Sequence, residues 1–134
     1  MSGLGDEARG LHREALDYNW DDGLAAPRRL LADPGCDRGT AFLLLWRSYS
    51  PLERILRDDD GRDDDSRDEP PWLRQVKEFA SEVEARLATG DFASEAIRVD
   101  LHDDLQLSRV QIEKLRRAGL GEHLLGPTPG VPFV

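Results

Sequence analysis

The amino-acid sequence predicts an all-α protein, a single compact domain over residues 1–134 with about five or six helices and at most one short extended segment. Three observations carry this prediction. Apolar residues recur at the spacing of one helical face in several stretches. Capping residues precede these stretches, and glycine or proline follows them. A chain of 134 residues can bury one hydrophobic core but is short for two lobes around a cleft.

The first expected helix lies between residues 4 and 18. Its apolar positions share one face, because they are three or four residues apart: Leu4, Ala8, Leu11 and Ala15. A second helix follows, for which Asp22 is a possible N-cap. Because Pro27 would break a helical hydrogen bond beyond the first turn, we expect the regular helix to begin near Ala26. Asp33-Pro34-Gly35 ends it.

The third expected helix is the central one. Asp37 can cap its start, and the segment 41–46 (AFLLLW) is apolar on every side. A helix without a polar face belongs in the middle of a fold. Directly after it, the stretch 50–53 (SPLE) forms a capping box with proline at the first helical position, which predicts a short fourth helix.

The segment 57–71 has a different composition. It holds eight carboxylates and three arginines, with no apolar residue besides its prolines. Such a segment cannot bury a core, so we predict a flexible Asp-rich loop. As a calcium loop it is poor, because placing Gly61 at the sixth position puts Leu56, which has no side-chain oxygen, at the first.

Two further helices are expected in the C-terminal half. The first is long, ends at Gly90 and carries its apolar face inward: Trp72, Val76, Phe79, Ala80, Val83 and Leu87. Residues 96–102 (AIRVDLH) are the extended candidate. Ser108 and Gln111 open the last helix, in which Val110, Ile112 and Leu115 are the apolar positions and which closes at Gly119. We expect the Pro/Gly-rich tail, residues 126–134, to lie against the surface or to hang free.

The charge balance restricts the class of partner. Lys and Arg number 18 against 27 Asp and Glu, a net charge of −9, and the basic residues are scattered along the sequence. Such a surface repels phosphate backbones and favours a basic protein partner. We see neither a signal sequence nor a membrane-spanning stretch, so we predict a cytoplasmic protein that contacts neither membrane nor nucleic acid. The oligomeric state is left open.

No catalytic or metal-binding motif stands out. The histidines His12, His102 and His123 lie far apart, and the cluster His102-Asp103-Asp104 is more typical of a surface turn than of a metal site. Cys36 could act as a nucleophile with a histidine as its base, but a lone cysteine is more often a buried apolar residue. Phosphate- and dinucleotide-binding glycine motifs are absent. We therefore predict neither metal nor cofactor.

The stretch YNWDDG, residues 18–23, presents two adjacent carboxylates beside two aromatic rings. These could bind a cation, but neighbouring carboxylates on one backbone seldom converge, and the same residues commonly end and start helices. We interpret the stretch as a structural corner in which Tyr18 and Trp20 pack on a helix and Asp22 caps the next one. Asp21 is not needed for capping and is a candidate for partner contact.

The block from YNWDDG to LLADPGCDRGTAFLLLW resembles domain-of-unknown-function family 4274, a bacterial family, and a looser likeness extends the resemblance over residues 8 to 118. The resemblance implies a protein similar to the small immunity proteins that are encoded beside toxins. It implies no reaction, cofactor or catalytic residue, because none is established for the family. Within the block, Asp37 caps a helix, Gly39 allows close approach of a neighbour, and Thr40 returns a hydrogen bond to the cap.

These observations lead to one favoured hypothesis, a non-catalytic binding protein, most concretely an immunity protein that masks a basic toxin or effector domain. The partner-binding residues are then Asp21, Asp58, Asp59, Asp60, Asp63, Asp64 and Asp65. The residues of the structural corner are Tyr18, Asn19, Trp20, Asp22, Gly23, Cys36, Asp37, Gly39, Thr40 and Trp46. One alternative is a regulatory or scaffold module that binds through its Asp-rich loop. Another is an enzyme or metal-dependent accessory that uses Asp21, Asp22, Cys36 and Asp37.

Overall fold

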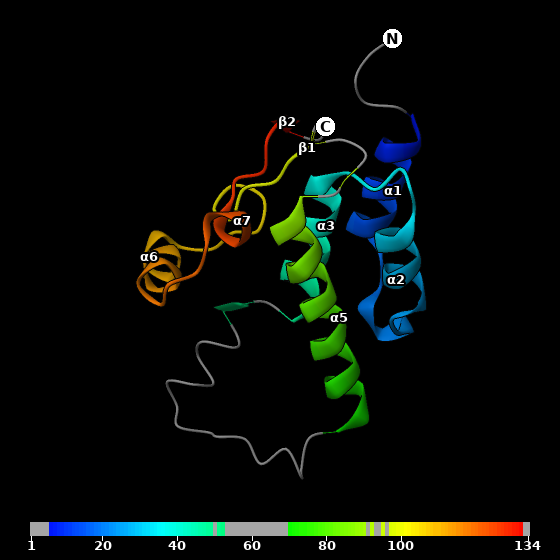
Figure 1. Cartoon of the computed structure of the whole chain (residues 1–134), viewed down its shortest axis with the longest axis horizontal. Helices are drawn as coiled ribbons and strands as arrows, with labels where there is room; N and C mark the ends of the chain where they lie inside the picture. The colour runs from blue at the N-terminus through cyan, green and yellow to red at the C-terminus, as the bar shows by residue number, and fades with distance from the viewer. Residues whose placement is uncertain are drawn as a thin grey trace.

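The structure is a computed structural model that describes residues 6–49, 51–52, 70–90, 92, 95 and 97–132. Figure 1 shows a helical molecule with one small pair of strands, which confirms the all-α prediction. The helices are α1 (Asp6–Asp17), the 3-10 helix η1 (Trp20–Asp22), α2 (Ala25–Ala32), α3 (Arg38–Ser48), α5 (Pro71–Thr89), α6 (Arg109–Arg117) and α7 (Glu122–Leu125). The strands are β1 (Ile97–Arg98) and β2 (Val131–Pro132).

Helix α3 is the centre of the core, as predicted. Every residue from Gly39 to Trp46 is buried, on all sides of the helix. In Figure 1 it lies between α5 on one side and α1 and α2 on the other. The apolar face of α5 that covers it consists of Leu73, Phe79, Ala80, Val83 and Leu87. Trp72 is 63% exposed, so the expectation that it points inward is wrong.

Helix α2 begins without the predicted cap. Its N-cap is Leu24, which makes no side-chain capping bond, and Asp22 belongs to η1 instead. Pro27 is the third residue of the helix. Since the first N–H groups of any helix have no partner within it, proline loses no hydrogen bond at this position. The capping role assigned to Asp22 is therefore wrong, while the start near Ala26 is correct to within one residue.

The C-terminal tail is built into the fold. Strands β1 and β2 pair in parallel, with Ile97 opposite Val131 and Arg98 opposite Pro132. The side chain of Thr128 is buried and accepts a hydrogen bond from the N–H of Val99 at 2.7 Å. The same hydroxyl donates to the carbonyl of Ile97, also at 2.7 Å. The tail is thus held against the fold through Thr128 and β2, which agrees with the expectation that it lies against the surface and contradicts the alternative that it hangs free.

The last helices differ from the prediction in two respects. The capping box of Ser108 and Gln111 opens α6 as predicted, with reciprocal hydrogen bonds of 3.1 and 2.8 Å. However, α7 follows, so α6 is not the last helix. Val110 is 79% exposed instead of buried, whereas Leu115 is fully buried.

Several predictions lie outside the described residues. These are the capping residues Ser50 and Glu53 of the expected fourth helix, and the Asp-rich loop with Asp58, Asp59, Asp60, Asp63, Asp64 and Asp65. The side chain of Asp21 is likewise outside the description. None of the described helices is long and apolar enough to cross a membrane.

Candidate functional site

The start of α3 joins three parts of the chain. The carboxylate of Asp37 is fully buried, and its Oδ1 accepts the N–H of Gly39 at 2.8 Å, which caps the helix as predicted. The same oxygen accepts the N–H of Ile97 at 3.2 Å. One carboxylate therefore satisfies free backbone donors of both α3 and β1, which is why this charged group can be buried.

Gly39 permits the close approach that the sequence suggests. A Cβ atom at this position would lie 2.2 Å from the carbonyl oxygen of Ile97. Thr40 has a different partner from the expected one. Its Oγ1 lies 2.9 Å from Nδ1 of His12, which links α3 to α1 instead of returning to the cap.

His12 is a buried residue that the sequence reasoning did not place in the core. It is only 2% exposed, and its pKa is lowered from 6.5 to about 4. Burial, which disfavours the charged imidazolium, is the largest cause, and Arg47 lowers the pKa further, while Asp37 and Asp104 raise it. His12 is therefore neutral at pH 7. Its position one residue after Leu11, on the buried face of α1, was the available signal.

Cys36 also belongs to this buried cluster. Its thiol is fully buried and lies 3.6 Å from the carbonyl oxygen of Asp37. Burial raises the pKa of the thiol to about 11, with smaller contributions from Asp37 and Asp33 that also raise it and from Arg86 that lowers it. The reactive thiolate is thus disfavoured, and Cys36 has the environment of a packing residue.

The YNWDDG stretch forms a corner between α1 and α2. The N–H of Asp22 donates to the carbonyl of Asn19 at 3.0 Å, and Gly23 has a left-handed φ of 94°. The hydroxyl of Tyr18 donates to the carbonyl of Gly23, and its ring meets Trp20 edge-on with centroids 5.4 Å apart. The ring of Trp20 in turn lies 6.5 Å from that of Phe79 in α5. The corner thus orients α1 and α2 and packs on the core.

The candidate metal cluster around His102 is a self-bonded surface turn. Oδ1 of Asp100 accepts the N–H groups of His102 and Asp103 at 2.8 and 2.9 Å. Oδ2 of Asp104 accepts the N–H of Asp100 at 2.7 Å. The carboxylates thus serve the backbone of the turn. Within the described residues, no group of three or more His, Cys, Asp and Glu is arranged to hold a metal.

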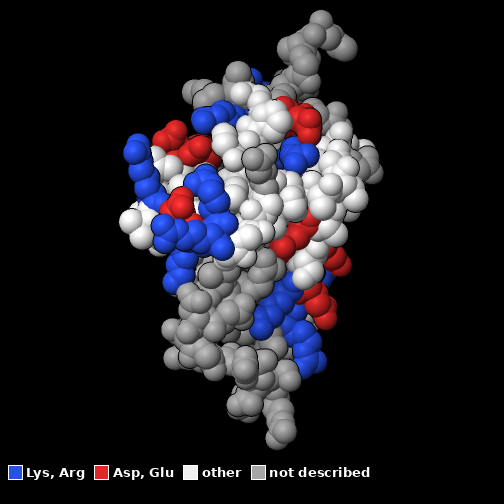
Figure 2. Space-filling view, turned by 60° about the vertical axis from the view of Figure 1, so that its left-hand side comes forward, with Lys and Arg blue, Asp and Glu red and all other residues white. Residues whose placement is uncertain are grey.

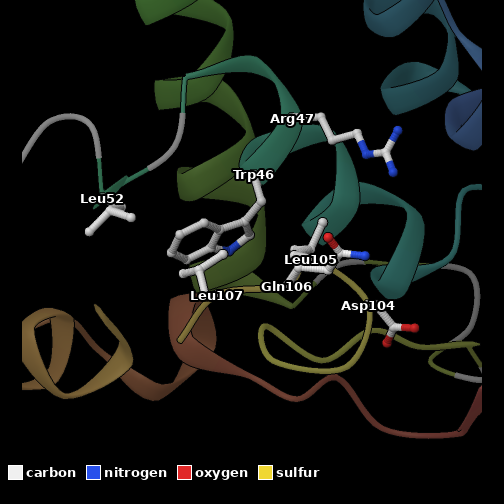
Figure 3. A pocket seen from close by; sticks show the side chains of 7 residues that line it. All are labelled: Trp46, Arg47, Leu52, Asp104, Leu105, Gln106 and Leu107. Carbon is white, nitrogen blue, oxygen red and sulfur yellow. The ribbon is translucent and has the colours of Figure 1, made fainter. Parts of the chain in front are cut away.

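A cavity of about 370 Å³ lies beside this turn, at the C-terminal part of α3. Figure 3 shows the indole of Trp46 in its middle, with Leu52 on one side and Arg47 and Asp104 on the other. The indole N–H donates to the carbonyl of Leu124 at 3.2 Å. Asp22, Cys36 and Asp37 are not among the residues that line this cavity: Trp46, Arg47, Leu52, Asp104, Leu105, Gln106 and Leu107.

Helix α6 carries a positive surface that the sequence reasoning overlooked. Four of its nine residues are basic, and one is acidic, Glu113. Figure 2 shows blue side chains gathered on one side of the molecule, around a few acidic atoms. A hollow of about 620 Å³ on this helix is lined by Arg109, Val110, Glu113, Lys114 and Arg117. The description of the basic residues as scattered is therefore wrong for this helix.

The described residues of the alternative catalytic site differ in burial. Asp22 is exposed on η1, whereas Cys36 and Asp37 are buried and engaged within the fold. Asp33 and Gly35 form the tight turn before them, with the N–H of Gly35 donating to Asp33 at 2.8 Å. Asp22 is thus open to solvent, whereas Asp37 is buried and bonded to backbone N–H groups.

Comparison with known proteins identifies one family. The model of a family described as Domain of unknown function (DUF4274) matches residues 6–88. The match spans α1 to α5 and therefore includes the corner, the cap of α3 and the central helix. The looser resemblance up to residue 118 is not part of it. No curated protein and no solved structure matches the chain.

Proposed function

The chain belongs to the DUF4274 family, and we propose that it is a non-catalytic binding protein, specifically an immunity protein that masks a cognate bacterial toxin through an acidic surface. The observation that carries the proposal is the internal use of the distinctive polar residues of the matched region. Asp37 caps α3 and holds β1, Thr40 contacts the buried His12, and Cys36 is packed. Because these residues are engaged inside the fold, they support a scaffold that presents a binding surface.

The charge of the chain indicates the chemistry of the partner. A net charge of −9 on 134 residues favours encounter with a positively charged protein and opposes encounter with nucleic acid. A toxin that cleaves nucleic acid needs a basic groove for its substrate, and an acidic protein is complementary to that groove. The proposed location is cytoplasmic, where such a toxin would act. The proposed contact residues remain Asp21 and the six aspartates of the loop.

Co-expression with the protein encoded by the adjacent gene tests the proposal. We expect the chain to restore growth to cells that express this toxin, and the two proteins to co-elute on size exclusion. A first variant, Asp58→Asn/Asp59→Asn/Asp60→Asn, removes three charges from the loop. A matched control, Asp17→Asn/Glu78→Gln/Asp103→Asn, removes three exposed charges elsewhere, so that both have a net charge of −6 instead of −9.

The loop variant should lose most of its protection, and the control should retain it. Equal protection by both would contradict the assignment of the loop. Unchanged toxicity in the presence of the wild-type chain, together with separate elution, would reject the immunity function altogether. Protein partners that bind the loop without being toxic would instead support the regulatory or scaffold alternative.

A further inference from the structure

Helix α6 has a charge opposite to that of the rest of the chain. Its four basic residues and one glutamate give a formal charge of +3 within nine residues, whereas the whole chain has −9. The remainder of the chain therefore carries −12. Glu113 pairs with Arg116 at 3.0 Å and with Arg117 at 3.5 Å, so the one carboxylate of the helix lies among its four basic residues. The result is a local positive surface on an acidic protein.

The exposed face of α6 is not needed to hold the helix in place. Leu115 is its buried residue. The capping box of Ser108 and Gln111 supplies hydrogen-bond acceptors to backbone N–H groups at its start. Val110 is 79% exposed and lies among the basic residues that line the hollow of about 620 Å³. This face of α6 therefore offers one apolar contact point with charged groups around it, the arrangement of an apolar centre with a polar rim.

We propose that this α6 face binds an acidic peptide segment of a protein partner, with an apolar side chain of the segment against Val110. The face consists of Arg109, Val110, Lys114, Arg116 and Arg117. Arginine forks match the geometry of carboxylates and bind them with paired hydrogen bonds. Val110 offers an apolar contact that a purely ionic ligand would leave unused.

The field of the whole molecule favours a peptide over nucleic acid as the ligand. A nucleic acid extends well beyond a nine-residue helix, so its phosphates would also meet the remaining chain with its charge of −12. A short acidic peptide can confine its charges to the helix. In Figure 1, α6 lies at the edge of the molecule away from α1 and α2. It also lies outside the region 6–88 that matches the family.

Fluorescence anisotropy with a labelled peptide tests this proposal. The probe is a ten-residue peptide of glutamates with one central leucine, titrated with the full chain at low salt. Arg109→Glu is the test variant and Arg74→Glu is its matched control, since both are exposed arginines in the first turn of a helix. A glutamate in the first turn is favourable for the helix dipole, so both variants should fold.

We expect the peptide to bind the wild-type chain, Arg109→Glu to weaken binding at least tenfold, and Arg74→Glu to change it less than twofold. Val110→Ser should weaken binding of the leucine peptide several-fold but leave binding of a serine-containing peptide unchanged. Equal losses for the two arginine variants, or no binding by the wild-type chain, would overturn the proposal. Preferential binding of an oligonucleotide, lost in Arg109→Glu, would also overturn it. Protection from a toxin does not enter this test, so the two proposals fail independently.

Discussion

At the scale of single residues, His12 makes the stability of the fold depend on pH. Its pKa is about 4 in the folded state and 6.5 in a solvated chain. Between these values the unfolded chain binds a proton that the folded chain does not. Its neutral form thus supports the fold fully above pH 6.5, and this contribution is lost as the pH falls towards 4.

We therefore predict that lowering the pH from 7.5 to 5 reduces the free energy of unfolding by about 2 kcal/mol through this one group. Urea unfolding at the two pH values measures the loss. In His12→Asn, whose amide can contact Thr40 but does not titrate, the loss between pH 7.5 and 5 should shrink by this amount. His123→Asn, in α7, is the control for the removal of a histidine elsewhere in the chain. An equal pH dependence in wild type and His12→Asn would contradict the role of His12.

Gly39 gives a second prediction at this scale. An alanine Cβ would lie 2.2 Å from the carbonyl oxygen of Ile97, and the backbone would have to move to relieve this overlap. We expect Gly39→Ala to lower the free energy of unfolding by about 2–3 kcal/mol, as overpacking does in cores. Gly10→Ala is the matched control, because it lies in α1 with no atom within 4 Å of the added group. It should be neutral or stabilise the protein by about 0.5–1 kcal/mol.

The role of an individual residue could be predicted where its hydrogen-bond partner lies nearby in the sequence. Asp37 bonds the N–H of Gly39 two residues away, so its capping role was visible in the sequence. Its second acceptor role, towards Ile97, joins residues 60 positions apart, and no local pattern encodes it. The contact between His12 and Thr40 was missed for the same reason. Asp22 satisfied the local preference for a cap, but it lies in η1, and Leu24 is the N-cap of α2.

At the scale of elements, the attachment of the C-terminal tail rests on Thr128. Its hydroxyl serves both the N–H of Val99 and the carbonyl of Ile97, each at 2.7 Å. We predict that Thr128→Val, which keeps the shape but removes the hydroxyl, lowers the free energy of unfolding by about 2–4 kcal/mol because two buried backbone groups lose a partner. Thr128→Ser retains the hydroxyl and should cost less than half as much in chemical denaturation. Equal costs would show that the methyl group matters more than the hydrogen bonds.

The helices were predicted more accurately than the strands. Helices α3, α5 and α6 have caps, glycine stops or long apolar faces, and each was predicted close to its observed bounds. Strand β1 (Ile97–Arg98) lies within the predicted extended segment of residues 96–102, whereas β2 (Val131–Pro132) was not predicted, because two residues are too few for an alternating pattern. The second of them lies in a proline-rich tail, where composition indicates a surface segment. Its place is fixed by Thr128, which is a tertiary contact.

At the scale of the whole molecule, the two proposed binding surfaces have opposite electrostatic requirements. Arg109→Glu replaces +1 by −1 and moves the net charge from −9 to −11, whereas Asp58→Asn/Asp59→Asn/Asp60→Asn moves it to −6. The overall field steers association with a charged partner and is screened by salt.

We therefore predict that Arg109→Glu leaves the association rate with a basic toxin unchanged or faster, while the triple variant slows it several-fold at low salt. For the acidic peptide the order reverses, since Arg109→Glu removes a contact and the triple variant removes repulsion. Stopped-flow measurements at about 20 and 300 mM salt, across which screening shortens the range of the field, should show both differences shrinking. If both variants slow association with the same partner, the two surfaces are not separate.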